Sequence, residues 1–290
     1  MLKVLVFILS KLPLRLHYWF SSWLLYPLIY YIVRYRRRIV ELNIEHSFPN
    51  LSVCQRRTIV KAFYKQLTDM FVEDIYGYSA SEEELLARVH FTNPDLVALL
   101  ARQTGGCLML LGHVGNWQWL CQIAKRLKPY GVNTTFVYAT QHNKSVNNLL
   151  LAMRSKSGGT VTPTSRLLRS MLEYDRQSLA TAYGMLIDQK PRPEQEHLSY
   201  QNIFLHQPTK WQTGSDSLAR RFSYGAVYAH IIRPQRGYYV IDFRLITDDP
   251  QKERENAITE RFATLLEENI HQQPELWLWS HNRWRIKLNR

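Results

Sequence analysis

The sequence C-L-M-L-L-G-H-V-G-N-W-Q-W-L-C, residues 107–121, joins a short apolar run to a polar turn and then to an aromatic run. An apolar run of this length is typical of a buried strand, and it ends here at Gly112 and His113. Asn116 is a suitable N-cap for a helix that begins at Trp117. The pattern therefore predicts a strand that places His113 at the start of a helix, with Gln118 in the first helical turn.

His113 is a candidate general base, because a histidine at a strand end can take a proton from a substrate hydroxyl group. The positive end of the following helix disfavours the resulting imidazolium by ~0.3–1 kcal/mol. A carboxylate would offset this cost, but the side chain five residues after the histidine is Gln118. We expect Gln118 to fold back and accept a hydrogen bond from Nδ1 without supplying charge. The alternative is that His113 is a polar strand-end residue without a chemical role.

The composition indicates a folded, basic protein. Its 290 residues are enough for one large domain or two small ones, and 37 Lys and Arg against 24 Asp and Glu give a formal net charge of +13. Such a charge predicts acidic partners, namely nucleic acid, anionic lipid headgroups or an acidic carrier protein. No nucleic-acid-binding motif is present, and basic residues cluster beside an apolar N-terminal segment. We therefore expect a membrane surface and no nucleic acid.

The three cysteines, Cys54, Cys107 and Cys121, have neither metal-ligand spacing nor the pattern of a disulfide framework. Cys107 opens the apolar strand and Cys121 lies among apolar helical residues, so we expect both to be packing residues. The chain also has no glycine-rich nucleotide loop. The sequence therefore predicts a reducing, cytoplasmic setting, with no metal and no cofactor.

Residues 16–33 form an apolar and aromatic run that is followed at once by four arginines between residues 34 and 38. A membrane-spanning helix needs about 20 apolar residues, and Pro27 interrupts this run. Two alternatives stay open: the run crosses the membrane once, or it lies in the interface. Because no cleavage site of small residues precedes the arginines, we expect the segment to be retained. We predict a membrane anchor over residues 1–38, with residues 39–290 on the cytoplasmic side.

The rest of the chain alternates between strand and helix patterns. Strand patterns cover residues 108–111, 134–138, 179–187, 226–232 and 238–246, and helical patterns cover residues 117–127, 143–155, 165–174 and 216–222. This alternation predicts an α/β fold with a largely parallel mixed sheet flanked by helices. The turn from Pro234 to Gly237 predicts an antiparallel hairpin between the last two strands.

Two further amphipathic helices are predicted on either side of this region. Ser52 is a candidate cap of the first, and Ser81 with Glu84 resembles a capping box for a short acidic helix after it. The apolar faces are expected to lie in the core, and they comprise Ile59, Val60, Phe63, Leu67, Met70 and Phe71 in the first helix and Ile258, Phe262, Leu265, Leu266 and Ile270 in the last.

Over nearly its whole length, the chain resembles the late acyltransferases of lipid A biosynthesis, the lauroyl and myristoyl transferase family of the glycerolipid acyltransferase superfamily. Besides the N-terminal segment, the motifs that carry the resemblance are R-R-I-V-E-L-N-I-E-H-S-F-P (37–49), G-H-V-G-N-W-Q (112–118), D-Q (188–189), T-G-S-D-S-L-A-R-R (213–221) and W-L-W-S-H-N-R-W-R (277–285). Their order and spacing implies a glycerolipid-acyltransferase-like fold in residues 39–290.

The resemblance also implies an activity and a set of site residues. The donor would be the thioester of an acyl carrier protein or of coenzyme A, and the acceptor a lipid hydroxyl group, most naturally that of a lipid A precursor at the cytoplasmic face of the cell inner membrane. His113 matches the family's base, and Gln118 stands where the family has Asp or Glu. Arg154 matches a basic family position, and the family's D-Q pair is Asp188 and Gln189. These three residues are predicted to bind substrate.

Asn116, within the same motif as His113, is also predicted to bind substrate. Family members usually have Tyr, then Arg or Lys, then Pro after the next strand, but here the residues are Tyr138, Ala139 and Thr140. The expected cation is therefore absent. Backbone N–H groups between residues 112 and 115 are expected to stabilise the oxyanion of acyl transfer. No Ser or Cys lies in a nucleophile-elbow pattern, so no acyl-enzyme is expected.

Several alternatives remain open from the sequence. The first is a pseudoenzyme that binds lipid without turnover, because Gln118 supplies no charge. Others are a glutamine introduced to trap substrate, and an active transferase whose acceptor is another lysolipid or an aminolipid. At the C-terminus, the basic residues bind anionic headgroups or only increase solubility, and the tryptophans lie at the membrane interface or in the core. The residues concerned are Arg283, Arg285, Lys287, Arg290, Trp277, Trp279 and Trp284.

Overall fold

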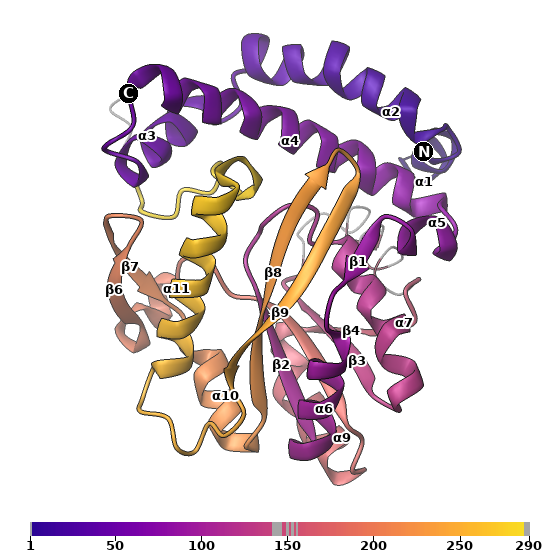
Figure 1. Ribbon diagram of the computed structural model, residues 1–290, viewed down its shortest axis with the longest axis vertical. Coiled ribbons are helices and arrows are strands. Elements are labelled where there is room, and N and C mark those ends of the chain that lie inside the picture. Colours follow the sequence, from indigo (N-terminus) through magenta and orange to yellow (C-terminus); the bar gives the residue numbers. More distant parts are fainter. Residues whose placement is uncertain (1, 141–146, 149–150, 152–153, 155, 287–290) are drawn as a thin grey trace.

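The computed structural model describes residues 2–140, 147–148, 151, 154 and 156–286, which form an α/β fold around a seven-stranded sheet (Figure 1). The strand order is β1-β9-β8-β2-β5-β3-β4. The strands are β1 (Val89–Phe91), β2 (Gly106–Leu111), β3 (Asn133–Tyr138), β4 (Thr160–Pro163), β5 (Thr181–Leu186), β8 (Gly225–Gln235) and β9 (Tyr238–Thr247). Strands β8, β2, β5, β3 and β4 are parallel, and β9 returns antiparallel to β8. The predicted α/β class and the antiparallel hairpin are confirmed.

The sequence pattern missed the two edge strands and one small hairpin. Strands β1 and β4 are short and lie at the two edges of the sheet. An edge strand needs fewer apolar residues, so its sequence shows no continuous apolar run. The strands β6 (Tyr200–Phe204) and β7 (Gln207–Trp211) form a separate two-stranded antiparallel sheet. Their alternating burial is that of a hairpin with one buried face.

Helices cover the sheet, and most of the predicted helices are present. The helices are α5 (Glu82–Leu86), α6 (Pro94–Thr104), α7 (Ile123–Leu127), α9 (Leu167–Arg176), α10 (Gly214–Phe222) and α11 (Ala257–Gln272), and of these α6 was not predicted from the sequence. The predicted capping box of Ser81 and Glu84 is confirmed at the start of α5, and the predicted face of α11 is buried. The helix predicted over residues 143–155 lies largely outside the described residues.

The longest helix, α4 (Val53–Ser79), crosses one end of the sheet above the tip of the β8–β9 hairpin (Figure 1). Ser52 caps it in a capping box with Gln55. Most of its predicted apolar face is buried or half-buried, but Phe71 is 57% exposed, so its assignment to the core was wrong. The buried face of α4 instead continues through Val72 and Tyr76.

The N-terminal region is helical and packs against α4 (Figure 1). It comprises α1 (Leu2–Ser10), α2 (Leu14–Phe20), two π-helical segments (Ser21–Leu25 and Leu28–Ile32) and α3 (Arg37–Ser47). Leu14 and Tyr30 belong to the same buried core as the sheet. The predicted division of the chain at residue 38 stays a prediction.

The predicted membrane-anchor helix is not found. Within the described part of the chain, no helix has both the length and the apolar character needed to cross a membrane. The reason is compositional, since serines, tyrosines and Pro27 interrupt the apolar run. Many large side chains of this region are nevertheless exposed, and we call them the apolar N-terminal surface. They are Val4, Leu5, Phe7, Ile8, Leu16, Trp19, Trp23, Leu24, Leu28, Tyr31, Ile32 and Val33.

The C-terminal segment is packed into the molecule. Trp277 and Trp279 are buried in the core, and Trp284 packs against it. Arg283 is also buried, and it donates to the carbonyl oxygen of Lys210 at 2.6 Å, so it is not placed to meet a headgroup. Arg285 forms an ion pair with Glu196 at 2.8 Å. The core alternative is therefore correct for the tryptophans, whereas Lys287 and Arg290 lie outside the described residues.

Candidate active site

His113 and Asp188 meet at the edge of the sheet where two neighbouring strands end. Strands β2 and β5 are parallel and paired in register, with Leu111 opposite Leu186. His113 and Asp188 each lie two residues beyond these paired positions. The carboxyl ends of parallel strands are where α/β proteins bind ligands. The topology therefore brings together two residues that lie far apart in the sequence.

A carboxylate holds the imidazole of His113 in place. Nδ1 of His113 lies 2.5 Å from Oδ1 of Asp188, and the backbone N–H of His113 donates to Oδ2 at 2.9 Å. The indole N–H of Trp277 donates to the same Oδ2 at 2.9 Å. Both carboxylate oxygens are thus engaged, and the arrangement fixes the orientation of the ring.

Asp188 is ionised despite its burial. Burial alone would raise the pKa of Asp188, but its electrostatic interaction with His113 and the hydrogen bonds from His113 and Trp277 outweigh this effect and lower the pKa to about 2. An ionised Asp188 only accepts hydrogen bonds, so the proton between the two side chains belongs to Nδ1 of His113. The other ring nitrogen, Nε2, then carries a lone pair and can act as a base.

The low pKa of Asp188 gives a testable dependence of stability on pH. A carboxyl group with a pKa of about 2 in the folded state and about 3.9 in the unfolded state stabilises the fold above the unfolded value. This contribution, on the order of 2–3 kcal/mol, is lost as the pH falls from about 4 to about 2. We expect the difference in free energy of unfolding between the wild type and Asp188→Asn, measured by urea denaturation, to shrink over this window. Parallel curves for the two proteins would contradict the ion pair.

Gln189 lies next to the free nitrogen of His113. Its side-chain Nε2 is 3.3 Å from His113 Nε2, and the residue is exposed. The His113 side chain itself retains 13% exposure. A substrate hydroxyl group can therefore reach the imidazole by displacing an exposed amide that makes a single long hydrogen bond to it.

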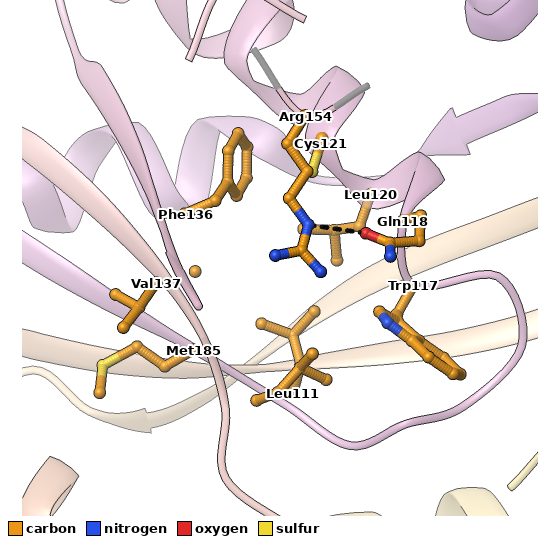
Figure 2. Close-up of a pocket in the computed structure, with 11 residues that line it drawn as sticks. Leu111, Trp117, Gln118, Leu120, Cys121, Phe136, Val137, Arg154 and Met185 are labelled. Atoms are coloured by element: carbon orange, nitrogen blue, oxygen red, sulfur yellow. Dashed lines mark hydrogen bonds between the residues drawn. The ribbon is translucent and has the colours of Figure 1, made fainter. Parts of the chain in front are cut away.

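The Gln118 side chain is hydrogen-bonded to Arg154 and not to Nδ1 of His113, so the predicted fold-back of this side chain was wrong. Its Oε1 accepts a hydrogen bond from Nε of Arg154 at 2.9 Å, as Figure 2 shows. Two causes are visible. Residues 117–118 form a turn and not the first turn of a helix, and Nδ1 of the imidazole is already bound to the stronger acceptor Asp188. The aromatic ring of Trp117 contacts the imidazole instead, with centroids 4.8 Å apart and an edge-to-face arrangement.

Asn116 is a structural residue in this fold. It is buried, its Oδ1 accepts the backbone N–H of Trp119 at 3.3 Å, and its side-chain amide donates to Glu73 at 3.1 Å. The helix predicted to begin at Trp117 instead begins as a 3-10 turn over Trp119–Gln122, with Gln118 as its N-cap, before α7, so the prediction that Asn116 is the N-cap was wrong. With both ends of its side chain bonded inside the protein, Asn116 is not placed to bind substrate.

Glu73 on α4 holds Asn116, in the turn that follows His113, and it was not identified from the sequence. Its carboxyl group accepts hydrogen bonds from Asn116, from Tyr239 at 2.8 Å and from Tyr18 at 2.8 Å. Burial raises the pKa of Glu73 above its ordinary value, and these three donors act in the opposite direction. An ionisable residue within a buried helix face between Val72 and Tyr76 was the available signal.

An apolar pocket opens beside the His113–Asp188 pair. Its walls come from the ends of β2, β3 and β5 and from the turn after His113 (Figure 2). The apolar lining residues are Leu111, Trp117, Leu120, Cys121, Phe136, Val137, Gly184, Met185 and Leu186. The two polar lining residues are Gln118 and Arg154, and Figure 2 shows the Arg154 guanidinium directed among the apolar side chains. The lining is apolar with a polar group at one end, but the pocket is small, with a volume of about 30 Å³.

Of the backbone N–H groups expected to form an oxyanion hole, those of residues 113–115 are already hydrogen-bonded. The N–H of His113 donates to Asp188, that of Val114 to the carbonyl of Gly112 at 2.8 Å, and that of Gly115 to the carbonyl of Leu276 at 2.9 Å. These bonds tighten the turn that holds His113. The expectation for these three donors was therefore wrong, because the same N–H groups stabilise the loop itself.

Two cysteines have the packing role expected from the sequence. Cys107 and Cys121 are buried, and burial raises the pKa of both thiols, to about 12 for Cys121. Each is therefore a neutral packing residue. Across the residues that the structure describes, no group of three or more His, Cys, Asp and Glu side chains is placed to hold a metal ion.

Comparison with known proteins gives a match to one protein family. Residues 3–286 match the family model described as bacterial lipid A biosynthesis acyltransferase. A search of curated proteins gives no match. The matched range covers nearly the whole chain and includes the His113–Asp188 pair and the pocket beside it.

Proposed function

Because the chain belongs to the bacterial lipid A biosynthesis acyltransferase family, we propose that it moves a fatty acyl chain from a thioester to a hydroxyl group of a lipid A precursor. The donor is the thioester of an acyl carrier protein or of coenzyme A. The observation that carries the mechanism is the contact between His113 Nδ1 and the ionised Asp188, which leaves Nε2 as a base beside an apolar pocket.

His113 acts as the general base in this proposal. Its Nε2 takes the proton of the acceptor hydroxyl group while the hydroxyl oxygen attacks the thioester carbonyl carbon. The tetrahedral intermediate then collapses, the carbon–sulfur bond breaks, and the leaving thiolate takes the proton from the imidazolium. The products are an ester and a free thiol. Asp188 stabilises the imidazolium throughout, which is the role that the sequence could not assign to Gln118.

In the same proposal the acyl chain enters at the apolar pocket, which must widen to admit it because its volume is only about 30 Å³. Trp117 lines the pocket and also contacts the His113 ring, so a chain inside the pocket ends near the base. Arg154 supplies a positive charge at the pocket and is suited to the carbonyl oxygen of the thioester or to an anionic part of a substrate. Gln118 holds the Arg154 side chain in position.

Turnover is better supported than lipid binding alone. The pseudoenzyme alternative rested on the missing charge at Gln118, and Asp188 supplies a carboxylate at the required atom of the imidazole. The reaction is expected at the cytoplasmic face of the inner membrane. The apolar N-terminal surface and the net charge of +13 favour a protein that lies in the membrane interface.

The test is direct transfer by the purified protein. Mass spectrometry of a lipid A precursor, incubated with the protein and an acyl carrier protein or coenzyme A thioester, should show the mass of one added acyl chain. Parallel reactions with a lysophospholipid and with an aminolipid separate the acceptor classes. No acylated product from any combination of donor and acceptor would contradict the proposed activity.

Gln118→Glu is expected to change kcat by no more than a few-fold. The new carboxylate would pair with Arg154 and not with His113, because Asp188 already occupies Nδ1 of the imidazole. An exposed or half-buried ion pair is worth only ~0.2–1 kcal/mol. Steady-state kinetics of the variant beside the wild type check this. A gain of a hundredfold or more would show that residue 118 is the functional partner of the base.

A further inference from the structure

A second cavity, of about 550 Å³, lies between the N-terminal helical region, α4 and the tip of the β8–β9 hairpin. It shares no lining residue with the pocket beside His113. Its polar lining includes two hydroxyl groups from the N-terminal region, a lysine and an aspartate from α4, and two arginines from the hairpin. These residues are Ser21, Ser22, Lys65, Asp69, Arg233 and Arg236.

The arginines are held in place by one buried carboxylate. Arg236 donates to both oxygens of Asp69, with a distance of 2.8 Å from Nε to Oδ2, and Arg233 lies 3.5 Å from Oδ2. Ser21 donates to Oδ1 of Asp69 at 2.6 Å. Arg236 also donates to the hydroxyl oxygen of Ser22 at 2.9 Å, which orients that hydroxyl at the cavity. The two guanidinium groups are therefore preorganised before any ligand binds.

The cavity keeps an excess of positive charge. Asp69 offsets one of the three cations, and in the described part of the chain no carboxylate lies within ion-pair distance of Lys65. The Lys65 ammonium lies 5.8 Å from the ring centre of Tyr26, which also lines the cavity. Two guanidinium groups, an ammonium and a serine hydroxyl at one cavity are the donors that phosphate oxygens prefer.

The surroundings indicate a phosphate that carries hydrocarbon chains. Trp23 lines the cavity and is 73% exposed, and its neighbour Leu24 is 55% exposed. Both belong to the apolar N-terminal surface. A free phosphate ion would not contact these apolar side chains. A lipid bound with its headgroup in the cavity would place its hydrocarbon chains along them.

We propose that this cavity binds the phosphate group of an anionic membrane lipid, with Lys65, Arg233 and Arg236 as its cations. Occupation would join the N-terminal region to the β8–β9 hairpin through one ligand. This site goes beyond the proposed acyl transfer, and its binding is measured without a donor, so either proposal can fail alone.

The experiment uses the full chain and sedimentation with phosphatidylcholine vesicles that contain about 20% phosphatidylglycerol. Lys65→Gln is expected to weaken binding about fivefold, the usual effect of one basic residue near an anionic surface. Lys65→Arg keeps the charge and should bind as the wild type does. The matched control is Lys252→Gln, which removes one exposed charge from the loop between β9 and α11, at the other end of the sheet (Figure 1).

Calorimetry with soluble lipids then separates the possible ligands. Dihexanoyl phosphatidic acid should bind the wild type more tightly than inorganic phosphate does, and Lys65→Gln should weaken that binding. Equal losses of vesicle binding from Lys65→Gln and Lys252→Gln would show diffuse electrostatic attraction and overturn the site. Inorganic phosphate that binds as tightly as the short-chain lipid would overturn the assignment to a lipid.

Discussion

His113→Gln is expected to lower kcat for acyl transfer by about 10⁴-fold, at the upper end of what a general base contributes. The glutamine amide can still accept a hydrogen bond from the acceptor hydroxyl group, but it cannot take the proton at neutral pH. The attacking oxygen would then carry its proton into the transition state. Steady-state kinetics with a lipid A precursor and a thioester donor measure the loss.

The controls for this variant separate chemistry from folding and binding. KM for the acceptor should change little, because His113 is only one contact of a large lipid. Far-ultraviolet circular dichroism should match that of the wild type, since the His113 side chain is partly exposed. A folded His113→Gln protein with kcat within tenfold of the wild type would show that another group takes the proton.

The sequence singled out both His113 and Asp188 but paired His113 with Gln118. Each strand-end position was visible, because the apolar runs before His113 and Asp188 end in polar residues. Their contact depends on β5 lying next to β2, with β3 and β4 on its far side. Strand order is set by packing of the whole sheet, so the apolar pattern of a single strand does not predict which strands lie next to it. Gln118 is the predicted partner only because it lies five residues from His113 in the sequence.

The N-terminal region shows a second limit of sequence patterns. Composition marked residues 16–33 as a spanning candidate, yet Tyr30 is 4% exposed and Ile32 is 74% exposed. Hydropathy treats both as part of one apolar run. Which side chains pack against α4, and which remain exposed, depends on the π-helical turns, and a helical repeat of 3.6 residues does not describe these turns.

Asp188→Asn is expected to lower kcat by about 10³–10⁴-fold while the protein remains folded. In the wild type Oδ2 accepts two hydrogen bonds, from the backbone of His113 and from Trp277, whereas Oδ1 faces Nδ1 of the imidazole. The asparagine must keep its oxygen towards the two donors. Its NH₂ group then faces Nδ1 and donates to it, so the imidazole proton moves to Nε2. The base loses the lone pair that takes the proton, and the imidazolium loses its counter-charge.

The tautomer provides a readout that a merely structural role would not change. Nitrogen-15 NMR of the histidines should show the His113 proton on Nδ1 in the wild type and on Nε2 in Asp188→Asn. Trp277→Phe is the matched control, because it removes one donor to Oδ2 but leaves the carboxylate, and the loss of one hydrogen bond of about 1 kcal/mol predicts a decrease in kcat of about fivefold. If kcat decreased no more in Asp188→Asn than in Trp277→Phe, the role of the Asp188 carboxylate would be structural. The charge that assists His113 would then have to come from another residue.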